Sequence, residues 1–131
     1  MNNGLNDLVN RWANTNKTIA VVGDSIYDQF EFGRITRLSS ENEQVSVISI
    51  KSRKESPGGA ANTAANIASL GGTVTLFTVV GEDHTADNLK RVIRKSGVNM
   101  SVVIDRDRPT TRKQRFYGDN IERFCSEWQE R

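Results

Sequence analysis

Two acidic residues follow the first strongly apolar segment of the chain, residues 18–22. Asp24 comes after Gly23 at the end of that segment, and Asp28 lies four residues further on. Carboxylates accept hydrogen bonds from hydroxyl groups, and polar groups beyond the carboxyl ends of parallel strands are well placed to touch a ligand. Both residues are therefore candidates for binding sugar hydroxyls. The alternative is that Asp24 caps a turn and Asp28 is solvated.

A second candidate is the glycine pair Gly58-Gly59, followed by Asn62 in an alanine-rich stretch. Paired glycines before a helix let the backbone approach a ligand and present N–H groups at the positive helix end. Asn62, one turn into the helix, would add a side-chain donor and acceptor on the same side. The alternative is a tight turn before a helix whose small residues pack on a sheet.

The third candidate is the basic cluster Arg112, Lys113 and Arg115. Cations on a strand suit a phosphate group, to which arginine can offer two hydrogen bonds at once. If the strand alternates, Lys113 and Arg115 share one face and Arg112 points away. The alternative is an exposed charged face, which is the usual fate of such clusters.

Other chemistry is excluded or poorly supported by the sequence. Neither the dinucleotide pattern G-x-G-x-x-G nor the P-loop G-x-x-x-x-G-K-[ST] occurs. His84 follows Glu82 and Asp83 at an expected helix start, where adjacent residues do not converge on a metal. A single cysteine, Cys125, excludes an internal disulfide and multi-cysteine metal sites.

The composition indicates one globular unit. The 131 residues contain 18 Lys and Arg against 16 Asp and Glu, and this net charge of +2 gives no argument for nucleic acid. No apolar run approaches the roughly 18 residues of a membrane span, and no secretory signal is present, so we expect a cytoplasmic protein. No repeat or linker divides the chain, and we treat residues 1–131 as a single domain.

Apolar runs and glycines predict alternating strands and helices. Continuous apolar segments that end at glycine are typical of strands buried on both faces of a parallel sheet. Apolar residues three and four apart indicate amphipathic helices, which glycines terminate. We expect strands at 18–22, 73–80 and 98–104, and helices at 5–12, 60–70 and 85–96. This order is that of an α/β fold.

Further strands are expected outside this sheet. Residues 30–33 and 44–50 are strand-like, with a polar loop at 34–43 between them. No helix follows that could cover them, so we expect residues 30–50 to leave the main sheet as a flap. Residues 110–124 are expected to form a hairpin with a tight turn at 118–120.

The glycine-rich stretch carries a resemblance to a known family. The segment 58–64, GGAANTA, followed by Gly71 and Gly81, resembles the N-terminal signature of the ribokinase-like, or PfkB, carbohydrate kinases. The opening GDSIYD is similar to the sugar-contacting opening of the same family. Within it, VVGDSIYDQFEFGRITRLSSENEQVSVI and PGGAANTAANIASLGG resemble the heptose-7-phosphate kinase branch, although residues 40–44 depart from the proline-containing segment usual there.

The resemblance covers about residues 17–124 and implies the N-terminal part of a ribokinase-like three-layer α/β sandwich with a small β flap, or lid. It implies a sugar bound between main sheet and flap, and a homodimer formed through the flap strands. The implied sugar-binding residues are Asp24, Asp28, Gly58, Gly59 and Asn62, and the implied phosphate-binding residues are Lys113 and Arg115.

The resemblance also implies ATP and Mg²⁺ as cofactors, but one motif is missing. Kinases of this family carry a C-terminal Gly-Ala-Gly-Asp signature, whose Asp is the general base and whose backbone amides bind the transferring phosphoryl group. Nothing of this kind follows Phe124, and we assign no catalytic residue and no ATP-binding residue. The expectation is the acceptor-binding half of a sugar or sugar-phosphate kinase. The alternatives are a non-catalytic sugar-binding or dimerising module, and one half of a split kinase whose C-terminal half is a partner chain.

Overall fold

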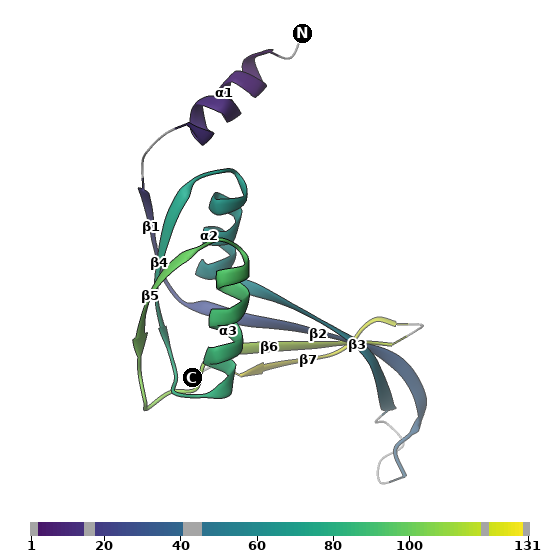
Figure 1. The fold of residues 1–131 in the computed structure, drawn as a ribbon. Helices are drawn as coiled ribbons and strands as arrows, with labels where there is room; N and C mark the ends of the chain where they lie inside the picture. Colours follow the sequence, from purple (N-terminus) through teal and green to yellow (C-terminus); the bar gives the residue numbers. More distant parts are fainter. Residues whose placement is uncertain (1–2, 15–17, 41–45, 119–120, 130–131) are drawn as a thin grey trace.

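The structure is a computed structural model that describes residues 3–14, 18–40, 46–118 and 121–129. Its helices and strands form two groups, an α/β layer and a long sheet that projects from it (Figure 1). In chain order they are α1 (Asn3–Ala13), β1 (Thr18–Val22), β2 (Ser25–Leu38), β3 (Ser46–Gly59), α2 (Ala60–Ser69), β4 (Thr73–Val80), α3 (His84–Lys95), β5 (Asn99–Ile104), β6 (Arg112–Gly118) and β7 (Ile121–Gln129).

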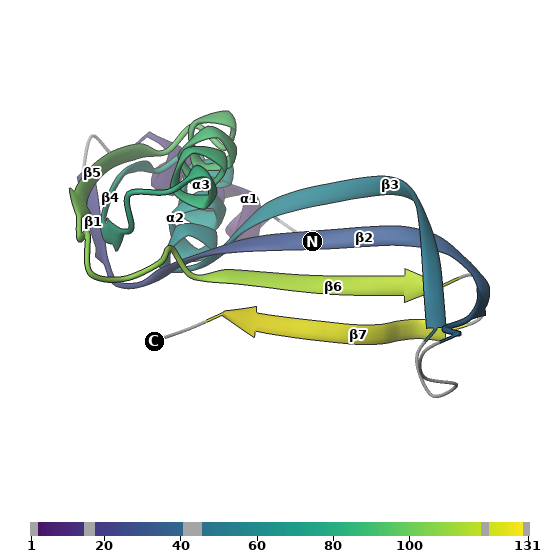
Figure 2. The same cartoon turned by 90° about the horizontal axis from the view of Figure 1, so that it is seen from below.

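The α/β layer is a parallel sheet with the strand order β1-β4-β5. Helices α2 and α3 both lie on one face of this sheet, as the view along its edge shows (Figure 2). Helix α3 connects the parallel strands β4 and β5, and α2 lies in the longer crossover from β1 to β4, as parallel pairing requires. The predicted α/β fold is confirmed, and the bounds of α2, α3, β4 and β5 agree with the predicted ranges to within one or two residues.

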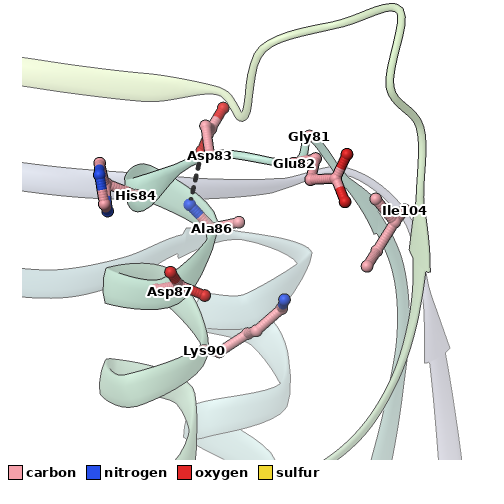
Figure 3. Close-up of a pocket in the computed structure, with 8 residues that line it drawn as sticks. All are labelled: Gly81, Glu82, Asp83, His84, Ala86, Asp87, Lys90 and Ile104. Atoms are coloured by element: carbon pink, nitrogen blue, oxygen red, sulfur yellow. Dashed lines mark hydrogen bonds between the residues drawn. The ribbon is translucent and has the colours of Figure 1, made fainter.

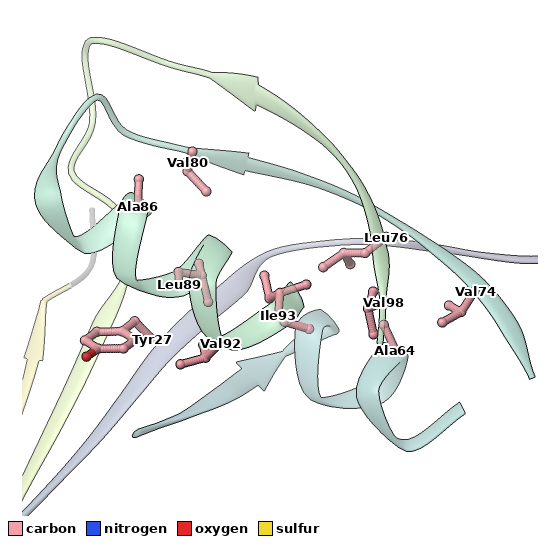
Figure 4. Close-up of a cluster of buried hydrophobic side chains, with 11 residues drawn as sticks. Tyr27, Ala64, Val74, Leu76, Val80, Ala86, Leu89, Val92, Ile93 and Val98 are labelled. Atoms are coloured by element: carbon pink, nitrogen blue, oxygen red, sulfur yellow. The ribbon is translucent and has the colours of Figure 1, made fainter. Parts of the chain in front are cut away.

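The hydrophobic core fills the space between this sheet and its two helices (Figure 4). Alternate residues of β4 point into it, and α3 contributes an apolar stripe spaced as on one helix face. Helix α2 contributes Ala61 and Ala64, whose small side chains let the helix approach the sheet closely. The largest fully buried apolar side chains are Leu76, Leu89, Ile93, Val74 and Val80.

The prediction that the parallel strands are buried on both faces was wrong for this chain. Val22, Phe77 and Val103 are exposed on the face that α2 and α3 leave open. Together with neighbouring residues they line a shallow apolar pocket of about 290 Å³. Helix α1 does not cover this face: it extends away from the sheet (Figure 1), and its described apolar residues Leu5, Leu8 and Val9 are exposed.

The second sheet has the strand order β3-β2-β6-β7 and forms the flap. It is larger than predicted, because β2 and β3 pair along residues 25–38 and 46–59 rather than within 30–50. The expected loop at 34–43 is therefore partly wrong: residues 34–38 continue β2, and residues 41–45 lie outside the described part. Strand β6 joins β2 in parallel and β7 joins β6 antiparallel, while the predicted turn residues 119–120 are not described.

Candidate functional site

The glycine pair lies at the point where the flap meets the α/β layer. Gly59 ends β3 opposite Ser25, and the amide of Ala60 at the start of α2 donates a 2.9 Å hydrogen bond to the Asp24 carbonyl. Gly59 has a φ of 60°, and a Cβ built there would lie 2.5 Å from the Asp24 carbonyl oxygen. Only glycine allows this close approach, so the backbone of Asp24 is docked against the N-terminus of α2.

Asp28 and Arg115 form the strongest ion pair of the candidate site. Arg115 Nη1 donates to Asp28 Oδ1 at 2.8 Å, and the two side chains are only 19% and 17% exposed. The second carboxylate oxygen of Asp28 lies against Gly58, where a side chain would overlap it. The Arg115 guanidinium also lies 5.0 Å from the centroid of the Phe30 ring, a favourable cation–π contact. Asp28 therefore holds Arg115 in place, a role that the sequence analysis did not predict.

Lys113 pairs with Asp28 across the parallel strands β2 and β6, and Arg115 pairs with Phe30. Residues paired in register share a face, so Lys113, Arg115 and Asp28 lie on one face of the flap and Arg112 on the other. Lys113 is half-buried and has interactions of its own. Asn62 is exposed on the first turn of α2, next to the glycine pair.

The sequence analysis missed Arg108, which lies in the loop between β5 and β6. Its Nη2 is 3.7 Å from Asp24 Oδ1; the Asp24 side chain is 76% exposed and that of Arg108 28%. The segment after β4 fixes the backbone of this loop. The Arg108 carbonyl fills the space beside Gly81, and the Thr110 amide donates to Asp83 Oδ2 at 2.8 Å. The site thus contains two pairs of opposite charge: Asp24 with Arg108 just before β2 begins, and Asp28 with Arg115 within β2 and β6.

The acidic segment after β4 stabilises local structure. Asp83 caps α3 by accepting from the Ala86 amide at 2.8 Å (Figure 3). Burial acts to raise the pKa of Asp83, but hydrogen bonds from Thr110 and Ala86 hold it below its usual value. Glu82 pairs with Arg106 at 2.9 Å. Glu82, Asp83 and Ala86 line a pocket of about 520 Å³ at the end of β4, in which the carboxylates of Glu82 and Asp83 already have partners.

Three residues tie the flap to α3 on the face opposite Asp28. The Tyr27 hydroxyl donates to Glu55 Oε1 at 2.5 Å, and Arg91 Nη2 of α3 donates to Glu55 Oε2 at 2.6 Å. The Tyr27 ring packs in the core beside Leu89 and Val92 (Figure 4). Burial raises the pKa of Tyr27 to about 12, so this hydroxyl stays a donor at physiological pH. The hydrogen bond from Tyr27, followed by those from Arg91, lowers the pKa of Glu55.

The lowered pKa of Glu55 predicts that the folded state loses stability in acid. A carboxylate whose pKa is depressed on folding stabilises the native state above its unfolded pKa, near 4.5, and loses that contribution as the pH falls through the folded value. Glu55→Gln should lower the free energy of unfolding by about 1–2 kcal/mol at pH 7 and by much less at pH 3. Urea unfolding across this range checks it. Glu82→Gln, in an exposed ion pair, is the matched control, and an equal loss at both pH values for Glu55→Gln would contradict the prediction.

The described residues include no group of three His, Cys, Asp or Glu side chains that could hold a metal ion. The first amide of α2 is taken by the Asp24 carbonyl, and the Ala86 amide of α3 by Asp83, so neither amide is available to a phosphate. We therefore derive no chemical step through ATP or Mg²⁺.

The fold and the site define an α/β domain with a β flap rooted at the carboxyl end of its first strand, where charged side chains gather. The sequence matches the pfkB family carbohydrate kinases over residues 16–129. This chain belongs to that family, and the resemblance seen in its glycine signature is confirmed. Kinases of the family generally use ATP and Mg²⁺. No helix in the described part of the chain is long and apolar enough to cross a membrane.

Two relatives are similar over most of this chain. It is 41% identical over 100 residues to D-beta-D-heptose 7-phosphate kinase of Bordetella bronchiseptica, a match that covers 76% of this chain and 32% of the relative. It is 42% identical over 102 residues to the bifunctional protein HldE of Shewanella amazonensis, covering 78% of this chain and 21% of the relative. The chain therefore spans between about a fifth and a third of the length of these relatives.

Solved structures support the fold. A carbohydrate kinase from Agrobacterium tumefaciens matches with a TM-score of 0.69 at 22% identity, covering 86% of this chain and 35% of the other. Phosphofructokinase-2 from Escherichia coli, solved with fructose-6-phosphate, matches with a TM-score of 0.64 at 17% identity. This match covers 87% of this chain and 35% of the other. The ribokinase-like α/β fold is confirmed by both, and this chain corresponds to about a third of each.

Proposed function

We propose that this chain is the acceptor-binding part of a carbohydrate kinase for a phosphorylated sugar of the heptose 7-phosphate type. The observation that carries the proposal is that the Gly58-Gly59 signature docks Asp24 against α2 and places Asp28 beside Gly58. Acidic, amide and basic groups thus converge where the flap leaves the sheet. The identity to a heptose 7-phosphate kinase supports the choice of sugar.

In this proposal the two ends of the site have different tasks. Asp24, Asn62 and the backbone of Gly58 and Gly59 bind hydroxyl groups of the sugar. Lys113 and Arg115 bind its phosphate, with Arg115 held by Asp28. Glu55 ties the flap to α3, and the flap in turn holds Lys113 and Arg115 in place. The general base and the ATP site would come from the part of the family fold that the relatives have beyond the matched region.

The experiment is acceptor binding by the Asn62→Ala variant. Asn62 is exposed, so its truncation leaves the fold intact but removes up to two hydrogen bonds to the sugar. We expect the affinity for D-heptose 7-phosphate, measured by isothermal titration, to fall about tenfold. Asn66→Ala, one turn further along the exposed side of α2, is the matched control. Equal affinity of both variants and the parent chain would contradict the proposal.

The uncovered face of the β1-β4-β5 sheet supports a partial kinase domain. Its exposed apolar residues, among them Val22 and Phe77, are the kind of surface that the rest of a larger domain would bury. Either a continuation of the chain or a separate C-terminal partner chain could supply that cover and the ATP site.

A homodimer through the flap is part of the proposal. The flap carries exposed apolar residues well outside the core, including Phe32, Leu38 and Ile50. Phe32 stacks on Tyr117 with ring centroids 5.1 Å apart, so an aromatic surface continues across two strands. A second flap would cover these side chains and the edge of β3.

A further inference from the structure

We propose that Arg108 is a sugar-binding residue, which together with Asp24 holds two neighbouring hydroxyl groups of the acceptor. The inference rests on the proposed function and adds a residue that determines which sugar binds. It starts from the ion pair between Arg108 and Asp24 at the carboxyl end of the parallel sheet. In open parallel sheets this edge is where ligands bind.

Both members of the pair are positioned by rigid backbone. The Asp24 carbonyl accepts from the Ala60 amide and lies against Gly59. The loop that carries Arg108 is fixed to the other side of the sheet edge, because Gly81 N donates to Thr110 Oγ1 at 2.9 Å and the Asp83 carboxylate accepts from the Thr110 amide. Two separately anchored segments therefore bring a carboxylate and a guanidinium group to one point, which is the preorganisation that a binding site needs.

The distance within the pair leaves both groups able to bind a ligand. At 3.7 Å, the Arg108 and Asp24 side chains attract each other but are too far apart for a hydrogen bond. A carboxylate only accepts and a guanidinium only donates, whereas a hydroxyl group does both. Two adjacent sugar hydroxyls, one donating to Asp24 and the other accepting from Arg108, match this pair.

The balance of charge differs between the Asp24–Arg108 pair, which suits hydroxyl groups, and the Asp28–Arg115 pair with Lys113, which suits a phosphate. Arg108 is balanced by the exposed carboxylate of Asp24, which would repel a phosphate dianion placed beside it. On the flap, the two cations Lys113 and Arg115 share a face with Asp28, and two positive charges beside this one carboxylate favour an anion there. Asp24 and Asp28 are four residues apart on extended chain, about 13 Å, so one sugar phosphate can reach from one pair to the other.

The test compares two arginines of the same loop. Arg108→Gln should weaken the binding of D-heptose 7-phosphate and of unphosphorylated D-heptose by the same factor, about tenfold, leaving the preference between them unchanged. Arg106→Gln, two residues earlier and paired with Glu82, should bind both sugars like the parent chain. An affinity of Arg108→Gln equal to the parent, or a loss for the phosphorylated sugar alone, would overturn the inference.

Deoxy sugars give an independent readout. Removing the hydroxyl that accepts from Arg108 should weaken binding to the parent chain about tenfold, and should weaken binding to Arg108→Gln markedly less, because the partner of that hydroxyl is already gone. If every monodeoxy analogue weakens both proteins equally, the inference is wrong. Arg108→Lys, which keeps the charge but not the planar fork, serves as the second variant should Arg108→Gln fold poorly.

The same titrations separate this inference from the proposed function. If Asn62→Ala weakens sugar binding while Arg108→Gln does not, the acceptor site stands and the role of Arg108 fails. If the folded parent chain binds neither sugar, the proposed function fails, and the inference fails with it.

Discussion

Replacing Gly59 with alanine is expected to disrupt both the fold and the acceptor site. Gly59 has φ 60° and ψ −135°, a conformation almost reserved for glycine, and the new Cβ would press on the Asp24 carbonyl oxygen at 2.5 Å. Backbone strain and the displacement of Asp24 together should lower the free energy of unfolding by about 2–4 kcal/mol. Because Asp24 moves, sugar-phosphate binding should fall well over tenfold. Urea unfolding and isothermal titration measure the two effects.

Gly97→Ala provides the matched control for this variant. Gly97 also has a positive φ, 74°, but a Cβ there would meet nothing within 4 Å. Its replacement should lower the free energy of unfolding by about 1 kcal/mol, the cost of a positive φ for alanine, and leave sugar binding unchanged. Similar losses of stability and binding in the two variants would contradict the role given to the contact between Gly59 and Asp24.

The second large effect is expected at the half-buried ion pair between Asp28 and Arg115. Asp28→Asn leaves a guanidinium that is less than one-fifth exposed beside a neutral group, and Arg115→Gln leaves the carboxylate in the same state. Each single variant should lose about 2–3 kcal/mol of stability, and the double variant should lose clearly less than the sum of the two. The preference for phosphorylated over plain sugar should also fall in all three variants, because Arg115 is removed or no longer held.

The exposed pair between Glu82 and Arg106 is the reference for that cycle. Its two atoms are 2.9 Å apart, close to the 2.8 Å between Arg115 and Asp28, but both of its side chains are solvent-exposed. The same double-variant cycle there should give a coupling free energy below about 1 kcal/mol. If the coupling between Asp28 and Arg115 is no larger, then Asp28 does not hold Arg115 and its carboxylate is better assigned to the sugar alone.

The helices and core strands of the α/β layer could be predicted because their signals are local. Asp83 caps α3 at the helix start that the sequence analysis expected, and glycines follow the ends of both helices as predicted. The flap was predicted too short because residues 34–38 and 51–55 are mostly polar or charged. Such residues form strands here through main-chain pairing between β2 and β3, with many of their side chains left in solvent.

The contacts within the site depend on pairing over long sequence distances. Asp28 and Arg115 are 87 residues apart and meet only because β6 joins β2 in parallel. The need for Gly58 and Gly59 also comes from the pairing of β3 with β2, because Gly59 meets the Asp24 carbonyl and Gly58 meets the Asp28 side chain, but the glycine pair itself is visible in the sequence. Arg108 lies among Asp105, Arg106 and Asp107 in a charged loop, and nothing in its spacing distinguishes it from its neighbours.

The central claim is the proposal that this chain binds a sugar phosphate through the residues around Gly58 and Gly59. The most direct test is a titration of the ¹⁵N-labelled chain, followed by the amide resonances of Asp24, Gly59 and Asn62, first with D-heptose 7-phosphate and then with MgATP. The account predicts saturable shifts of these amides with the sugar phosphate and not with MgATP. Equal shifts of these amides with both ligands, or a folded chain that does not respond to the sugar phosphate, would contradict it.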